Sequence, residues 1–72
     1  MYKFEIIESI VKDLDFKSKD EVVRLAKKMS DLAKKNPDYS AEVKQAFSDA
    51  YDEINSPELT LENLLEIKKL LN

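Results

Sequence analysis

Carboxylates are the side chains in this sequence best suited to acid–base chemistry near neutral pH. The 72 residues contain 15 Asp and Glu but no histidine and no cysteine. The usual general base, the thiol nucleophile and the soft metal ligands are therefore missing. Paired carboxylates can replace them only where burial separates their pKa values. The best candidates for such a pair are Asp49, Asp52 and Glu53, which fall on the polar side of a predicted helix. We therefore expect their carboxylates to be solvated, and we expect neither enzyme activity nor a cofactor.

Residues 13–24 begin like a calcium-binding loop. Asp13 and Asp15 occupy the first and third positions, where such loops carry acidic ligands. The fifth position is Lys17, the sixth lacks glycine, and the twelfth is Arg24 where a bidentate glutamate is needed. The chain has no glycine at all, so no loop lets the backbone approach a phosphate closely. We expect neither a metal site nor a phosphate site.

Charge is distributed unevenly along the chain. Residues 1–16 carry a net charge of −2, residues 17–35 of +4 and residues 36–72 of −5, which gives −3 for the whole sequence. The helix predicted over residues 19–35 is therefore basic, and the second half of the chain is acidic. A charge pattern of this kind is informative about partners and association rates rather than about the fold.

The acidic residues of the second half form a strip on the helix predicted over residues 38–54. Like charges four residues apart repel by about 0.2–0.5 kcal/mol, and acids near a helix C-terminus are disfavoured by the dipole. Two interpretations follow: lysines of the basic helix lie opposite and neutralise the strip, or the strip faces a basic surface of another protein and speeds its capture. The residues of this acid strip are Asp38, Glu42, Asp49, Asp52 and Glu53.

The last predicted helix, residues 58–71, carries more apolar surface than one packing face can cover. At about 100° per residue, its leucines and isoleucine spread over roughly 220° of the circumference. Such a helix is either the centre of the bundle or keeps part of its surface for a partner, which is another protein or a second copy of the chain. The side chains expected at that surface are Leu61, Leu65 and Leu70.

The basic helix also raises nucleic-acid binding as an alternative. Arg24, Lys27, Lys28, Lys34 and Lys35 line its outer face. An acid interrupts them at position 31, no aromatic residue is available for base stacking, and the whole chain is acidic. A solvated face is therefore the favoured interpretation, and nucleic-acid binding stays an alternative.

Four amphipathic segments predict an all-α fold. Helices are expected over about residues 2–14, 19–35, 38–54 and 58–71, joined by short breaks that imply antiparallel neighbours. The expected architecture is a single domain, residues 1–72, built as a compact four-helix bundle or an orthogonal four-helix array. The buried stripe of the second helix is predicted to contain Val22, Leu25, Ala26, Met29, Leu32 and Ala33.

Capping residues predict where the helices begin. Ser18 with Glu21 three residues later has the spacing of a capping box. The third helix begins after Asn36 or after Ser40, and the last begins at Ser56 and Pro57, with a later start at Thr60 as the alternative.

No signal peptide and no membrane span are expected, because charges interrupt the N-terminal apolar residues and no long apolar run follows. The lack of cysteine favours the cytoplasm.

These patterns favour a small protein-interaction module. Small inhibitor or immunity-type proteins have this general character of an acidic helical bundle without catalytic groups, a likeness of fold and charge that no sequence motif carries. The alternatives are a homodimer formed through the leucine-rich last helix, an engineered helical mini-protein, and nucleic-acid binding through residues 19–35. Tyr2, Tyr39 and Tyr51 are expected at the edge of the core with wet hydroxyl groups.

Overall fold

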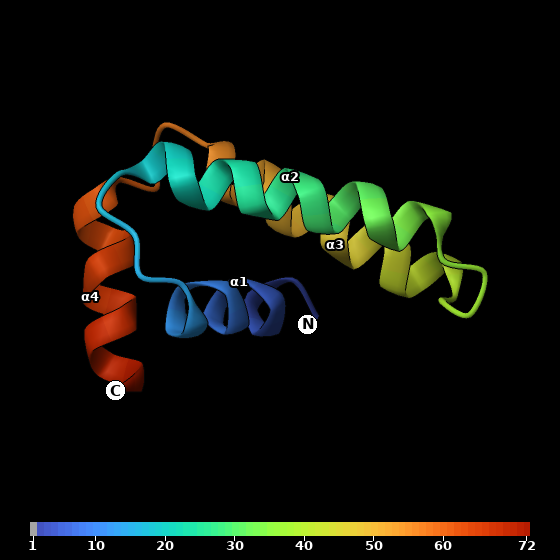
Figure 1. The fold of residues 1–72 in the computed structure, drawn as a ribbon, viewed down its shortest axis with the longest axis horizontal. Helices are drawn as coiled ribbons and strands as arrows, with labels where there is room; N and C mark the ends of the chain where they lie inside the picture. The colour runs from blue at the N-terminus through green and yellow to red at the C-terminus, as the bar shows by residue number, and fades with distance from the viewer. Residues whose placement is uncertain (1) are drawn as a thin grey trace.

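The part of the chain that the structure describes contains four helices (Figure 1). The computed structural model describes residues 2–72, with Tyr2 described by its backbone alone. Within that range there is no β-strand, so the predicted all-α class is confirmed. The helices are α1 (Tyr2–Asp13), α2 (Lys19–Lys35), α3 (Ala41–Asn55) and α4 (Leu61–Leu71).

The helices α2 and α3 form an antiparallel pair, and the other two helices cover only part of it (Figure 1). α1 packs chiefly against α3, while α4 packs chiefly against α1 and runs across the end of the pair. Because a helix rises 1.5 Å per residue, α1 is about 18 Å long and α2 about 26 Å long. The far ends of α2 and α3 therefore extend beyond α1 (Figure 1).

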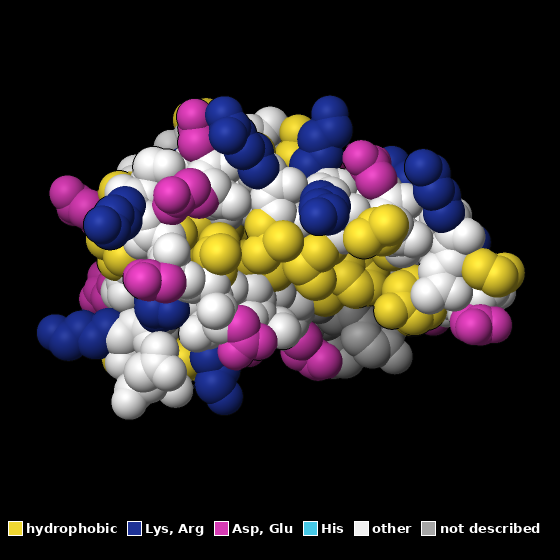
Figure 2. All heavy atoms as spheres, in the orientation of Figure 1, with side chains coloured by type: hydrophobic (Ala, Val, Ile, Leu, Met, Phe, Trp, Pro, Cys, Tyr) yellow, Lys and Arg dark blue, Asp and Glu magenta, His cyan; other side chains and the backbone are white. Residues whose placement is uncertain are grey.

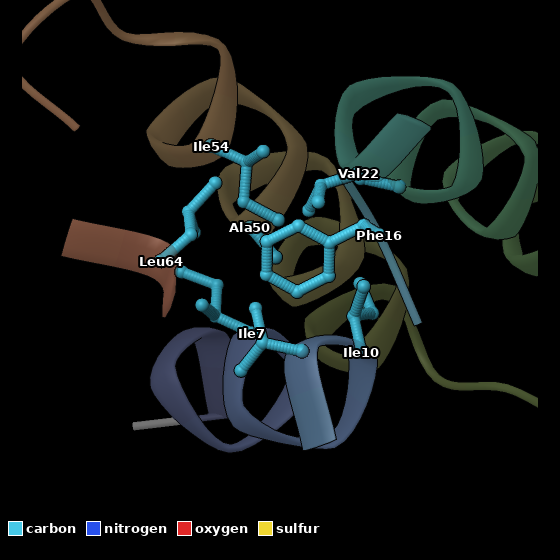
Figure 3. Packing of buried hydrophobic residues seen from close by; sticks show 9 residues of the cluster. Ile7, Ile10, Phe16, Val22, Ala50, Ile54 and Leu64 are labelled. Atoms are coloured by element: carbon cyan, nitrogen blue, oxygen red, sulfur yellow. The ribbon is translucent and has the colours of Figure 1, made fainter. Parts of the chain in front are cut away.

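The core lies where all four helices meet. Figure 3 shows the ring of Phe16, from the connection between α1 and α2, surrounded by side chains of every helix. The sequence pattern had assigned Phe16 only to a break between helices, yet it is 4% exposed. The buried cluster consists of Ile7, Ile10, Val11, Phe16, Val22, Ala26, Ala50, Ile54 and Leu64.

Two predicted helix starts are wrong by a few residues, and local hydrogen bonds explain both. The side chain of Asn36 accepts the backbone N–H of Asp38 at 2.9 Å, which makes a turn in place of a first helical turn. Ser56 likewise accepts the N–H of Glu58 at 3.3 Å. α3 therefore begins after Ser40 and α4 after Thr60, the two later starts that the sequence left open.

The observed N-caps are made by short polar side chains. Ser40 Oγ accepts the N–H of Val43 at 3.2 Å, and Thr60 Oγ1 accepts the N–H of Asn63 at 3.2 Å. The predicted capping box of Ser18 and Glu21 is present at the start of α2. Each of these bonds satisfies a backbone donor that the helix itself leaves free.

Lysines from other helices cap two C-termini in place of glycine. Lys68 Nζ of α4 donates to the backbone oxygens of Val11, Lys12 and Leu14, at 3.1, 3.2 and 2.8 Å, at the end of α1. Lys19 Nζ of α2 donates to Ser56 O at 2.6 Å, at the end of α3. Each ammonium lies at the negative end of a helix dipole and satisfies free carbonyl groups there. These contacts hold α4 to α1 and α2 to α3.

Candidate functional site

Three neighbouring hollows form one open apolar groove along α2. The first lies between α2 and the start of α3, the second between α2 and the end of α1, and the third between α1 and α3. Met29 lines all three and so marks the middle of the groove. Figure 2 shows the groove as a band of hydrophobic side chains across the face of the molecule. Its apolar lining consists of Ile6, Ile10, Leu14, Leu25, Met29, Leu32, Ala33, Tyr39, Val43 and Phe47.

The groove is open because α1 packs chiefly against α3 and leaves the facing edge of α2 partly uncovered, and because the far end of α2 extends beyond α1. Leu25, Met29 and Leu32 lie at i, i+4 and i+7, on one edge of α2. Leu25 and Met29 are half-buried, whereas Leu32, beyond the reach of α1, is 59% exposed. The prediction that Leu32 is buried is therefore wrong. The sequence carries no local signal for this gap, because the gap depends on where α1 packs.

Aromatic rings form the far end of the groove. Tyr39, in the connection between α2 and α3, stacks on Phe47 of α3 with ring centroids 5.9 Å apart and planes 6° apart. Tyr39 is 40% exposed, as expected for a residue at the edge of the core. Tyr51 packs against the core and is half-buried, and the side chain of Tyr2 lies outside the described residues. Stacking orders the Tyr39 ring at a surface position.

Charges of opposite sign border the groove on its two long edges. On the α1 edge, Glu5, Ser9 and Asp13 follow one another at four-residue intervals and line the hollows. On the α2 edge, Lys28 and Lys35 each lie three residues after a groove leucine and are exposed. Figure 2 shows Asp and Glu side chains below the apolar band, over α1, and both Lys or Arg and Asp or Glu side chains on its α2 side. The lining is apolar and the two rims are charged, as in protein-binding surfaces.

The predicted acid strip is only partly assembled. Asp38 lies in the turn before α3, so it does not share the helix face with the other four residues. Glu42, Asp49, Asp52 and Glu53 lie on α3.

Within residues 2–72, no lysine of α2 lies within 4.0 Å of an acid of α3. Glu53 pairs instead with Lys3 of α1, Nζ to Oε1 at 3.1 Å, and Asp49 accepts a hydrogen bond from Gln45 at 2.9 Å. Lys19, which does reach α3, binds the carbonyl oxygen of Ser56. Direct pairing with the lysines of α2 therefore does not neutralise the strip.

The three leucines predicted for a partner have different environments. Leu61 packs against the core, whereas Leu65 and Leu70 are 43% and 82% exposed. Leu65 and Leu70 are five residues apart, which separates them by about 140° around α4. Glu66 and Lys69 lie between them and line the same shallow hollow. Charged side chains therefore separate the exposed leucines of α4.

The described residues, 2–72, hold no group of three or more acidic side chains placed to bind a metal ion. None of the helices in the same range has the length and apolar character needed to cross a membrane. No known protein family, curated protein or solved structure matches this chain.

Proposed function

We propose that the protein is a non-enzymatic recognition module that binds an amphipathic helix of another protein in the groove along α2. The observation that carries the proposal is the exposure of Leu32, at 59%, in line with Met29 and the stacked Tyr39 and Phe47. Large apolar side chains gathered in an open groove with polar rims are typical of sites that bind an apolar helix face. A cytoplasmic location, expected from the cysteine-free sequence, is part of this proposal.

The dimensions of the groove favour a helix as the bound element. Its α2 wall runs from Leu25 to Asn36, which is about 16 Å and equals about three helical turns. A helix that presents apolar residues at i, i+3 or i+4, and i+7 covers that length with one face. Met29 at the centre is unbranched and flexible, so it can adapt to partner side chains of different shape.

The acid strip has a secondary role in this proposal. Glu42, Asp49 and Asp52 lie on α3, and a partner with basic residues beyond its bound helix would be attracted toward this face. Long-range attraction of this kind changes the association rate more than it changes the lifetime of the complex. A basic partner surface would make the module resemble an inhibitor or immunity-type protein in its mode of action.

The experiment uses methyl NMR, because the chain has only two methionines and one of them is Met29. The protein, labelled at methionine methyl groups, is titrated with a synthetic helical peptide of about 18 residues, with leucines on one face and glutamine and alanine elsewhere. We expect the Met29 signal to shift in a saturable way. The absence of a shift at millimolar peptide would contradict the proposal.

Two exposed leucines supply matched variants. Leu32→Gln changes the groove, whereas Leu70→Gln changes an equally apolar residue on α4 outside it. Loss of a leucine contact of about 1.5–3 kcal/mol predicts at least tenfold weaker peptide binding for Leu32→Gln. We expect no change for Leu70→Gln. Equal effects of the two substitutions would show that the peptide binds nonspecifically and would overturn the proposal.

A further inference from the structure

We infer that the helix bound in the groove carries acidic residues along the flank that faces α2 and basic residues along the flank that faces α1. This inference rests on the proposed function and specifies the chemistry of the partner. The observation that carries it is the opposite sign of the charges beside the apolar lining: Glu5 and Asp13 of α1 line the hollows, and the exposed Lys28 and Lys35 of α2 each follow a groove leucine by three residues.

The α1 rim is acidic along its length. Glu5 and Asp13 line the hollows themselves, with Ser9 midway between them. Glu8 and Lys12 are also exposed on α1, and their helix positions place them farther from the groove. Their charges are opposite, so together they add no net charge to this side of α1. A basic side chain of the partner can therefore reach two carboxylates at the edge of the apolar surface without displacing an existing ion pair of Glu5 or Asp13 within residues 2–72.

The α2 rim is basic. Lys28 follows Leu25 by three residues and Lys35 follows Leu32 by three residues, which places each lysine about 60° from its leucine on the outer side. Glu21 borders the same edge, four residues before Leu25. The carboxylate of Glu21 is already engaged by the backbone N–H groups of Lys17 and Ser18, at 2.6 and 3.3 Å.

Asp31 also lies on α2, three residues after Lys28 and four before Lys35. It precedes the groove residue Leu32 by one position, about 100° farther round the helix. Asp31 therefore lies outside the two lysines as seen from the groove. Acidic residues of a helix bound in the groove would therefore lie closer to Lys28 and Lys35 than to Asp31.

Opposite rims also select the direction of the bound helix. Reversing a helix in a groove exchanges its left and right flanks while its apolar face stays in place. A partner with one acidic and one basic flank therefore matches both rims in a single chain direction. In the reverse direction, each flank lies beside a rim of its own charge, which is unfavourable.

The test compares three helical peptides that share one apolar face and differ only in their flanks: one acidic and one basic flank, two acidic flanks, or two basic flanks. Binding is followed by the Met29 methyl signal of the intact chain. We expect the mixed peptide to bind about threefold to tenfold more tightly than either uniform peptide at low salt, because exposed charge pairs contribute modestly. The difference should shrink at about 1 M salt, where the Debye length is short.

A charge-reversal variant and a matched control locate the effect. Lys28→Glu with Lys35→Glu makes both rims acidic, so the preferred peptide should become the one with two basic flanks. Lys27→Glu with Lys34→Glu makes the same change of net charge and has the same spacing. These two lysines lie about 160° from the groove leucines, on another side of α2, so the preference for the mixed peptide should remain.

The outcomes separate this inference from the function on which it rests. If all three peptides shift Met29 with equal affinity, the groove binds helices but the rim inference is wrong. If none shifts Met29, the proposed function itself fails. If sedimentation shows that a second copy of the chain occupies the groove and excludes the peptides, the inference is also overturned.

A second experiment tests the direction of the bound helix. A spin label at the N-terminus of the mixed peptide should broaden protein signals at one end of the groove only. Broadening at both ends would contradict the selected direction.

Discussion

Lys68 Nζ lies 2.8 Å from the backbone oxygen of Leu14, although the two residues are 54 positions apart in the sequence. The same ammonium group also binds the carbonyl oxygens of Val11 and Lys12. A single side chain of α4 thus binds three carbonyl groups at the C-terminus of α1. This contact helps to hold α4 across the end of the molecule, and it leaves the groove along α2 uncovered by any helix of the described chain.

Replacing Lys68 with methionine should lower the free energy of unfolding by about 1–3 kcal/mol. The substitution keeps the apolar stem and removes charge-assisted hydrogen bonds to carbonyls that would then lose their partner. Urea denaturation followed by circular dichroism measures the change. Lys69→Met, at the adjacent exposed position, is the control and should change the value by less than about 0.5 kcal/mol. Equal effects at the two positions would contradict the capping role.

Phe16 and Phe4 provide a second contrast. Phe16 is 4% exposed and lies in the core, whereas Phe4 is 59% exposed. We expect Phe16→Ala to cost about 3–5 kcal/mol, which is a large part of the stability of a chain of this size. Phe4→Ala should cost less than about 1 kcal/mol. Thermal and urea denaturation of the two variants compare them directly, and a larger loss for Phe4→Ala would refute the observed core.

Two adjacent acids of α3 should respond in opposite ways to loss of charge. Asp52 is exposed near the C-terminal end of α3, where a negative charge is unfavourable, so Asp52→Asn should raise the free energy of unfolding by a few tenths of a kcal/mol. Glu53→Gln removes the pair with Lys3 and should lower it by about 0.2–1 kcal/mol. Denaturation at low salt measures both. A stability loss for Asp52→Asn would indicate that lysines do neutralise the acid strip.

Leu32→Gln should leave the fold intact. Because Leu32 is 59% exposed, its replacement by a polar side chain should change the free energy of unfolding by less than about 0.5 kcal/mol. Leu64→Ala, at a fully buried position, should cost about 2–5 kcal/mol. Urea denaturation of both variants checks these values. A large loss for Leu32→Gln would place that residue in the core, as the sequence pattern predicts, and would remove the exposed end of the groove.

Helix number and approximate position could be predicted from the sequence, because apolar periodicity and capping residues are local signals. The capping box at Ser18 and Glu21 is an example. The starts of α3 and α4 were harder to predict, since Asn36 and Ser56 use their side chains to form turns before the true caps. The choice between turn and helix at these positions depends on small differences in local hydrogen bonding.

The candidate site could not be predicted in the same way, because it depends on how helices of unequal length are placed against one another. The periodicity of α2 identifies Leu32 as apolar, but only the position of α1 shows that nothing covers it. The lysine caps at the ends of α1 and α3 also join residues that are far apart in the sequence. The acid strip and the α4 leucines were local predictions, and the structure separates Asp38 and Leu61 from the residues grouped with them.

The most direct test of the account is a filtered NOE experiment on the complex of labelled protein with an unlabelled helical peptide of mixed flanks. Met29 lines every part of the groove, so its methyl group should show NOEs to the leucine methyl groups of the peptide. Peptide NOEs that arise only from residues outside the groove, such as Leu65 and Leu70 on α4, would contradict the proposed binding surface.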